Sequence, residues 1–387
     1  MGSRSKIPNL PDDIVNSILL VLPVKSLLRF KITCKSWCCS IDDPDFIKSH
    51  LHISSNDISR QKILLFDVVN NGKIPRDYSI KVLSTEASIS NDSKAVPLDQ
   101  PNISGFRSCH LQVFSCNGLV FIYHPKNSMI LWNPAIRKYK RITVLQNKPG
   151  FVGAKFGFAY DVVAEDYKVL CIQQVENDYI VEIYSVKNQS WRTIPNIFPD
   201  PTDFPLYLFR SIVSLNGVIH IMPGTGNRAA EPGQYSVISF HLADEKFTAM
   251  PVPSKCGELL ILHAYGDRVC VVGTVGQEIL IWSPEKDGET GFLTWNNIRK
   301  FPALGSVVGM PQYSGNVILV MEYGNIGDLI CVKEDGNILW KRNTGEFVEY
   351  SARKNEYTEF IAKEIPLSAK IGPLYAESLV SLKIPWD

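Results

Sequence analysis

The sequence has almost no net charge and no long apolar run. Its 387 residues carry 40 basic and 39 acidic side chains, a formal charge of +1, which gives no broad field to attract phosphates or anionic lipid. The longest apolar stretches, such as residues 18–22, fall far short of the roughly 20 residues that span a bilayer. We therefore expect neither a nucleic-acid-binding protein nor a membrane protein.

Regular cysteine spacing is also missing. The nine cysteines are an odd number, scattered between Cys34 and Cys331, and the N-terminal residues reach Pro8 and Pro11 without an apolar signal core. This pattern predicts reduced thiols and an intracellular protein, located in the cytoplasm, the nucleus or both.

Motifs of catalysis and metal binding are absent as well. There is neither a nucleophile elbow nor a Gly-x-x-x-x-Gly-Lys phosphate loop. Residues 224–229 are glycine-rich, but Pro232 and Gly233 follow too soon for the helix that a dinucleotide site requires. His50 and His52 have no cysteine or acidic cluster at metal-ligand spacing beside them. We expect a non-catalytic protein without a cofactor or metal.

What the sequence does contain first is a helical segment, residues 10–51. Pro11 suits a first helical position, Asp12 and Asp13 favour the positive helix N-terminus, and Pro23 stops the helix. The apolar side chains of this helix cover an arc of about 160°, wider than one packing surface needs. Three more short helices are expected, at residues 24–31, around residues 34–41 and from residue 43. A unit of about 40 residues without disulfides or metal should need a partner surface.

The order of these residues resembles the F-box, over about residues 6–48. The match includes both Leu-Pro pairs, the Leu-Leu-Arg-Phe stretch at residues 27–30 and the Lys-x-Trp pair that ends at Trp37. The resemblance implies docking onto a Skp-type adaptor, and through it onto a cullin-based ubiquitin ligase, with Trp37, Ile41 and Phe46 closing the small core. The alternative is that the first helix packs on the rest of this chain. The adaptor contacts that the resemblance implies are Leu10, Pro11, Ile14, Ile18, Leu22, Pro23, Leu27 and Leu28.

From Gln61 onward the chain changes to short β-type runs separated by Gly, Pro and Asn. One unit recurs: an apolar strand that ends in an aromatic residue, a polar turn and a second strand. Five marker aromatics lie 52, 56, 42 and 58 residues apart, close to the kelch period of about 50. They are Trp132, Tyr184, Phe240, Trp282 and Trp340. A sixth blade is expected from residues 61–66, 78–83 and 378–382, which would join the two ends of the chain in a closed ring.

This region resembles the F-box-associated domain of plant F-box proteins. The motifs that carry the resemblance occur in the family's order at residues 116–119, 131–135, 156–161, 165–169, 190–192 and 215–220. Together the two resemblances imply an α+β multidomain protein. A helical F-box is expected at residues 6–51, and an all-β, propeller-like domain of the kelch type with about six blades at residues 58–387.

The same motifs also have a plain structural interpretation. The Asn-Gly pairs at residues 117–118 and 216–217 are typical of hairpin turns that need positive φ, and Trp132 and Trp191 are expected to be core aromatics. The basic run at residues 137–141 should be divided between two faces of a strand, with binding of an acidic protein as the alternative.

The two parts indicate an adaptor without its own chemistry. The F-box would anchor the chain to a ligase, and the β ring would hold a target protein for ubiquitination and degradation. Two alternatives stay open: a module that sequesters its partner without degradation, and an enzyme or carbohydrate-binding propeller with an appended helical unit. Target contacts are expected in two Pro/Gly-rich loops, around residues 202–208 and 224–234. The residues singled out there are Thr202, Asp203, Phe204, Leu206, Tyr207, Asn227 and Arg228.

Overall fold

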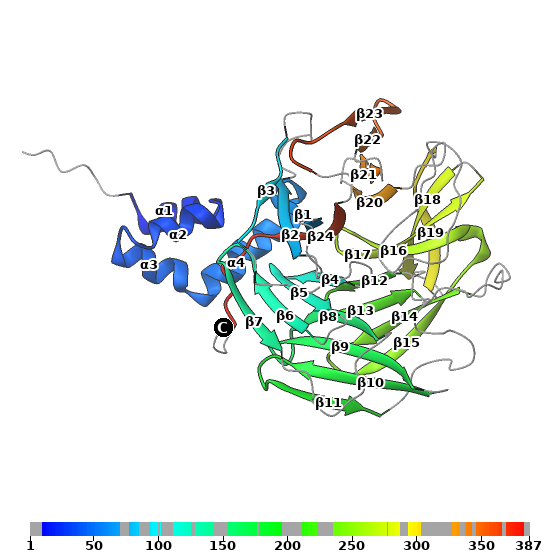
Figure 1. Ribbon diagram of the computed structural model, residues 1–387, viewed down its shortest axis with the longest axis horizontal. Helices are drawn as coiled ribbons and strands as arrows, with labels where there is room; N and C mark the ends of the chain where they lie inside the picture. The colour runs from blue at the N-terminus through cyan, green and yellow to red at the C-terminus, as the bar shows by residue number, and fades with distance from the viewer. Residues whose placement is uncertain are drawn as a thin grey trace, which may run out of the picture.

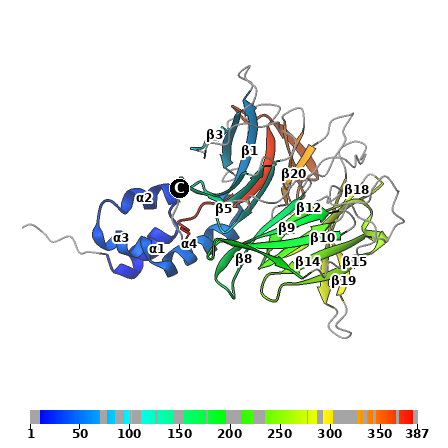
Figure 2. The same cartoon turned by 60° about the horizontal axis from the view of Figure 1, so that its bottom comes forward.

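A small helical unit stands beside a ring of strands in the computed structural model of the chain (Figure 1). A second view shows the same separation of helices and strands (Figure 2). The structure describes residues 10–69, 77–84, 93–99, 101, 111–124, 128–142, 154–175, 178–195, 211–222, 235–276, 278–286, 293–302, 327–332, 337–342, 346–365 and 369–382.

The helical unit consists of four short helices, as the sequence predicts. They are α1 (Asp12–Leu20), α2 (Val24–Phe30), α3 (Lys35–Asp42) and α4 (Pro44–Asn56). Pro11 and Pro23 stand immediately before α1 and α2, where a missing N–H costs nothing. The Asp43 carboxylate accepts the Asp45 and Phe46 N–H groups at 2.9 and 3.1 Å and so caps α4. Prolines and caps therefore set the helix starts, and α4 runs five residues beyond residue 51.

A compact apolar cluster holds the four helices together. Its buried members from the helices are Leu19, Val24, Leu27, Ile41 and Phe46. The Trp37 ring packs edge-on against Phe30, with 5.4 Å between ring centroids. His50 is buried too, and its Nε2 lies 2.9 Å from the Leu22 carbonyl oxygen, so this histidine belongs to the helical core. The structure agrees with the expectation that Trp37, Ile41 and Phe46 close the core.

The strands within the described ranges form six four-stranded antiparallel sheets, the blades of a six-bladed propeller. Blade 1 holds β4 (Gln112–Cys116), β5 (Leu119–His124), β6 (Ser128–Asn133) and β7 (Lys138–Ile142). Blade 2 holds β8 (Lys155–Asp161), β9 (Asp166–Val175), β10 (Asp178–Ser185) and β11 (Ser190–Ile194). Blade 3 holds β12 (Ser211–Leu215), β13 (Val218–Met222), β14 (Tyr235–His241) and β15 (Lys246–Val252).

The remaining strands make three further blades. Blade 4 holds β16 (Glu258–Tyr265), β17 (Arg268–Val275), β18 (Glu278–Lys286) and β19 (Leu293–Pro302). Blade 5 holds β20 (Gly327–Val332), β21 (Ile338–Arg342), β22 (Phe347–Ser351) and β23 (Glu356–Phe360). Blade 6 holds β24 (Lys370–Ala376), β1 (Gln61–Val69), β2 (Asp77–Ser84) and β3 (Val96–Pro97).

Blade 6 joins the two ends of the chain, as expected, but through a different segment. The strand that pairs with β1 is Lys370–Ala376, in a register that sets Ala376 opposite Gln61, and residues 378–382 form no strand. The reason is that Leu379 packs into the helical core while Leu382 packs between blades 1 and 2. The expected closing strand at residues 378–382 is therefore wrong by several residues, although ring closure itself is present.

The repeating aromatic pattern corresponds to the third and fourth strands of a blade. In four blades an aromatic near the end of the third strand lies directly opposite an aromatic seven residues later on the fourth strand. The pairs are Trp132–Tyr139, Tyr184–Trp191, Phe240–Phe247 and Tyr350–Tyr357. The marker assigned to Trp340 is wrong, because Trp340 lies on β21, the second strand of blade 5. Tyr350 is the residue that occupies the marker position in that blade.

Both predicted Asn-Gly turns are confirmed. Asn117 and Gly118 have φ values of 51° and 74°, and Asn216 and Gly217 repeat the same two values. Each pair links the first strand of a blade to the second. Trp132 is fully buried, as predicted, while Trp191 is half-buried and packs on the cluster between blades 1 and 2.

The two faces of the ring can be distinguished by their contact with the helical unit. Since neighbouring strands alternate in direction, the first-to-second and third-to-fourth turns of every blade lie on one face. In blade 1 the third-to-fourth turn contacts the helical unit through Ala135 and Ile136, so this face is called the proximal face. The innermost strands β4, β8, β12 and β16 begin on the opposite, distal face.

Candidate functional site

The first helix carries a stripe of exposed apolar side chains. Ile14, Ile18 and Val21 lie at spacings of four and three residues, which places them on one side of a helix, and they are 48%, 47% and 51% exposed. Leu10, just before the helix, is 60% exposed, and Pro11 is exposed beside it. We call Leu10, Pro11, Ile14, Ile18 and Val21 the α1 stripe. Exposed apolar side chains that are contiguous rather than scattered mark an interaction surface.

The remaining implied adaptor contacts take different positions. Pro23 is exposed, whereas Leu22 and Leu28 are half-buried and pack on the helical core. Leu27 is fully buried at 0% exposure and is part of the helical core. Its side chain belongs to the apolar cluster that holds the helices together. Val21 was absent from the implied set, although the arc of apolar residues on the first helix includes it.

The chain's own propeller contacts the helical unit elsewhere. The helical core extends to Leu379 of the C-terminal segment and to Ala135 and Ile136 of the blade 1 turn. Figure 1 shows the helices beside the blade 1 strands, with the C-terminus close to them. Among the described residues nothing covers the α1 stripe. The alternative that the first helix merely packs on the rest of the chain does not fit this exposure.

The C-terminal segment ties the helical unit to the ring. The Asn133 side-chain amide donates to the carbonyl oxygens of Ser378 at 3.1 Å and Val380 at 2.8 Å. Its oxygen accepts the Ala135 N–H at 3.0 Å, and the residue is completely buried. Leu379, between the two acceptors, then enters the helical core. We call residues 378–382 the C-terminal clamp, because they bind blade 1 and the helices at once.

Gly118 makes room for this clamp. A Cβ at that position would collide with the side chain of Ser378 and with the carbonyl oxygen of Ala376. Ser378 Oγ also lies 3.3 Å from the Asn117 carbonyl oxygen, to which it donates. The Asn-Gly turn therefore serves two purposes, positive φ and close approach of the C-terminal segment.

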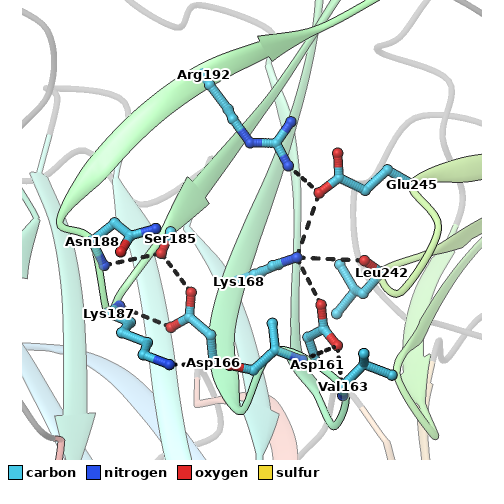
Figure 3. Close-up of polar contacts among 11 residues, drawn as sticks. Asp161, Val163, Asp166, Lys168, Ser185, Lys187, Asn188, Arg192, Leu242 and Glu245 are labelled. Atoms are coloured by element: carbon cyan, nitrogen blue, oxygen red, sulfur yellow. Dashed lines mark hydrogen bonds and ion pairs between the residues drawn. The ribbon is translucent and has the colours of Figure 1, made fainter.

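A polar network lies between blades 2 and 3 on the proximal face (Figure 3). Lys168 Nζ donates to Asp161 Oδ2 at 2.7 Å and to the Leu242 carbonyl oxygen at 3.4 Å, and it lies 3.5 Å from Glu245 Oε1. Arg192 pairs with the same Glu245 carboxylate. Lys168 and Arg192 belong to blade 2, whereas Leu242 and Glu245 belong to the β14–β15 turn. The network thus joins two blades.

Next to it, Asp166 fixes a turn within blade 2. Its carboxylate accepts Ser185 Oγ–H at 2.5 Å and the Lys187 N–H at 2.8 Å. A hollow of about 230 Å³ lies there, lined by side chains that include Asp166, Lys168, Lys187 and Arg192. The acidic and basic groups of the network neutralise one another, so we assign this region a structural role rather than a binding role.

Replacing Lys168 by methionine is expected to lower the free energy of unfolding at pH 7 by about 2 kcal/mol. The change leaves the buried Asp161 carboxylate without its cation, although the Val163 and Ala164 N–H groups still donate to it. Denaturant unfolding of wild type and variant would measure the loss. Lys187→Met, which removes an exposed ammonium next to the network, should change stability by no more than about 0.5 kcal/mol; equal losses would contradict the assignment.

The same pair predicts a pH dependence. Burial opposes ionisation of Asp161, but Lys168 and the two backbone N–H groups outweigh it and hold the pKa below the ordinary value of 3.8. A carboxylate whose pKa is lowered by folding stabilises the fold above that ordinary value and loses its contribution as the pH falls through the folded-state pKa. Between about pH 5 and pH 3, a range that includes the ordinary carboxyl pKa, wild type should therefore lose more stability than Lys168→Met. Denaturant unfolding at each pH would measure the two losses.

The basic run at residues 137–141 forms a turn residue and the outer strand β7. Arg137 lies 3.7 Å from Asp99, and the Arg141 guanidinium lies 5.8 Å from the centroid of the Tyr139 ring. Lys138 and Arg141 are exposed, Tyr139 and Lys140 are half-buried. Because β7 is a regular strand, Tyr139 and Arg141 lie on one face and Lys138 and Lys140 on the other, as predicted, and the two arginines have partners within the propeller.

The expected target contacts and the expected absence of a metal site can be compared with the described residues. The target-contact residues Thr202, Asp203, Phe204, Leu206, Tyr207, Asn227 and Arg228 lie outside the described residues. The first group lies between β11 and β12, and the second lies between β13 and β14. Strands β11 and β13 end on the distal face, and strands β12 and β14 begin there. Among the residues that the structure describes, no group of three or more His, Cys, Asp or Glu side chains could hold a metal ion. Nor does any helix in the described ranges have the length and apolarity to cross a bilayer.

Comparison with known families gives two matches along the chain. Residues 7–49 match the F-box domain, and residues 71–382 match the F-box associated beta propeller domain. The first match contains the α1 stripe, and the second covers most of the six blades.

Individual relatives are similar to this chain over most of their length. F-box/kelch-repeat protein At3g23880 of Arabidopsis thaliana is 27% identical over 327 residues, which cover 81% of this chain and 85% of that protein. F-box/kelch-repeat protein At3g44120 of the same plant is 27% identical over 378 residues, covering 92% and 90%. Among solved structures, TolB from Acinetobacter baumannii aligns with 83% of this chain and 66% of its own, at 10% identity and a TM-score of 0.41.

Proposed function

The chain belongs to the F-box proteins that carry an F-box associated beta propeller domain, and from this premise we propose that it is the target-recognition subunit of a cullin-based ubiquitin ligase. In this role the F-box binds a Skp-type adaptor, and the propeller binds a target protein. The observation that carries the proposal is the α1 stripe, a contiguous apolar surface that the described parts of the chain leave uncovered.

The adaptor side of the proposal depends on helix α1. Its stripe offers Ile14, Ile18 and Val21 as a row that an apolar groove of the adaptor can bury. Each of these side chains is about half exposed, so complete burial gives roughly 1 kcal/mol per residue. Leu10 and Pro11 extend the row before the helix, and Pro23 extends it after the helix. Leu27 contributes indirectly, because it packs in the apolar cluster that holds the four helices together.

The target side of the proposal is the distal face. The proximal face is partly occupied by the helical unit through Ala135, Ile136 and Leu379. The distal face is opposite, and the long connections at residues 196–210 and 223–234 leave the strands there. Connections on a rigid scaffold are where recognition residues concentrate. A target held there projects away from the helical unit.

The mechanism is proximity. Holding a target near a ubiquitin-charged enzyme converts a bimolecular encounter into an effectively intramolecular one, with an effective concentration set by the geometry of the link. A rigid link keeps the target lysines within reach, and the C-terminal clamp supplies rigidity between helices and ring. The chain itself performs no bond chemistry in this scheme. Its proposed location is the cytoplasm or nucleus, where the ligase works.

Reconstitution tests the proposal. Full-length protein is mixed with a Skp-type adaptor and cullin complex, and proteins that bind it in cells are identified by mass spectrometry under proteasome inhibition. The expected result is a stoichiometric complex with the adaptor and a bound protein whose half-life shortens when this chain is present. A bound protein with an unchanged half-life would instead indicate the sequestering module, and no complex with the adaptor would refute the ligase role.

A further inference from the structure

Lys155 is the first residue of β8, at the distal end of the innermost strand of blade 2. Gly157 and Ala159 on this strand face blade 3. A Cβ on Gly157 would collide with Ile219, and Ala159 packs in one apolar cluster with Ile219 and Ile221. Because side chains alternate along a strand, Lys155 lies on the same side as Gly157. Its side chain therefore enters the seam between blades 2 and 3 at the distal end of that seam, which we call its mouth.

This lysine is buried without a partner. Its exposure is 8%, and it has no hydrogen bond or ion pair with any residue that the structure describes. Among the described residues, the ammonium is not one of the enclosed polar side-chain atoms that lack a hydrogen-bond partner, so it keeps some contact with solvent. Lys168, which is similarly buried at the other end of the same seam, is paired with Asp161 and Glu245. The lysine at the proximal end of the seam is therefore paired, whereas the lysine at the distal end is not.

A buried ammonium without a counter-charge is costly for the fold. Lysine is almost never buried unless it is paired, and burial alone lowers the pKa of Lys155. The same desolvation makes the site a better anion receptor, because charges attract more strongly where water is excluded. The neighbouring Gln112 does not neutralise the charge. Its amide is engaged by the Ala154 carbonyl oxygen and the Phe156 N–H.

We propose that Lys155 receives an anionic group of the target protein, a side-chain carboxylate or a phosphoryl group, at the distal mouth of the seam between blades 2 and 3. This inference rests on the proposed function, because it assigns the contact to the face that holds the target. The strand ends around the mouth, Ser211 of β12 and Met222 of β13, flank the loops at residues 196–210 and 223–234. An anion that enters forms a charge-assisted hydrogen bond with the ammonium and removes the cost of its isolation.

The first experiment uses small anions with the full-length protein. Thermal unfolding is measured in increasing inorganic phosphate or N-acetylglutamate, at an ionic strength held constant with chloride. Wild type should become more stable as the anion concentration L rises, following RT ln(1 + L/Kd) for one site. Lys155→Met should melt at a higher temperature than wild type without anion, because an isolated charge is replaced by an apolar chain of similar length. Its apparent anion affinity should fall about tenfold or more.

Controls keep the result interpretable. Lys354→Met removes an exposed turn lysine and should respond to anions as wild type does. If Lys155→Met does not fold, Lys155→Gln must lose the anion response in its place. The proposal is overturned if wild type shows no anion response, or if wild type and the folded Lys155 variant respond alike. A larger response to phosphate than to N-acetylglutamate assigns the contact to a phosphoryl group, and the reverse order assigns it to a carboxylate.

A peptide experiment separates this proposal from the ligase role. Fluorescein-labelled peptide mixtures with a fixed central phosphoserine, glutamate or alanine are titrated with wild type and Lys155→Met, and binding is read by polarisation. Wild type should prefer an anionic centre by about tenfold, and the variant should show no preference. Equal binding of all three mixtures by wild type would refute the proposal. Adaptor binding is measured separately, so a chain that selects anions but binds no adaptor keeps this inference and loses the ligase role.

Discussion

The double substitution Ile14→Asp and Ile18→Asp is expected to weaken binding to a Skp-type adaptor at least about a hundredfold. Both side chains are half exposed on the α1 stripe, so an adaptor groove that buries them would have to desolvate two carboxylates. The free energy of unfolding should change by less than about 1 kcal/mol, because neither residue belongs to the helical core. Binding is measured by calorimetry, and stability by denaturant unfolding.

Two matched variants decide whether the stripe itself matters. Leu293→Asp introduces a carboxylate at an apolar residue of β19 that is 52% exposed, and adaptor affinity should stay that of wild type. Leu27→Ala alters a fully buried residue and should lower stability by about 3 kcal/mol, with any loss of binding following the loss of helical structure. If the double variant binds the adaptor as tightly as Leu293→Asp does, the α1 stripe is not the adaptor surface.

Replacing Asn133 by leucine is expected to destabilise the protein by roughly 5 kcal/mol. Leucine has nearly the shape of asparagine but can neither donate to the Ser378 and Val380 carbonyl oxygens nor accept the Ala135 N–H. Each buried backbone group left without a partner costs about 1 to 3 kcal/mol. Denaturant unfolding gives the total loss.

Hydrogen exchange shows where that loss acts. Once Asn133 no longer holds the C-terminal clamp, Leu379 should leave the helical core, and amides of α1 and α2 should exchange faster than in wild type. Asn296→Leu removes an exposed amide that donates to Glu285 Oε2 at 2.7 Å, and its effect should stay below about 1 kcal/mol. Unchanged exchange in the helices of Asn133→Leu would show that the clamp does not couple the two parts.

The helices were predictable because their signals are local. Pro11, Pro23 and the Asp43 cap act within a few residues of the helix starts, so no distant contact is needed to place them. The same holds for the Asn-Gly turns at residues 117–118 and 216–217, where positive φ is required by the hairpin alone. Repetition extended this local information to the ring, since four of the six blades repeat one pair of facing aromatics.

The predictions from sequence were wrong where a segment suited two structural positions equally well by its local pattern. Residues 378–382, which include Leu379, Val380 and Leu382, suit a strand by local preference. Instead the Asn133 amide binds two of their carbonyl oxygens, and Leu379 and Leu382 pack into different apolar clusters. Trp340 resembles the marker aromatics, yet pairing places it on the second strand of its blade. In both cases a long-range contact decided between alternatives of similar local preference.

The candidate surfaces divide in the same way. By itself the sequence determined the four helix starts, the F-box order, the blade repeat and the hairpin turns, because caps, φ preferences and apolar spacing act over a few residues. Only the tertiary structure decided that Ile14 is exposed while Leu27 is buried, and that Lys155 is unpaired while Lys168 has two carboxylates. The physical reason is that exposure and charge pairing depend on which distant segments pack against a side chain, and these segments meet only when the whole chain is folded.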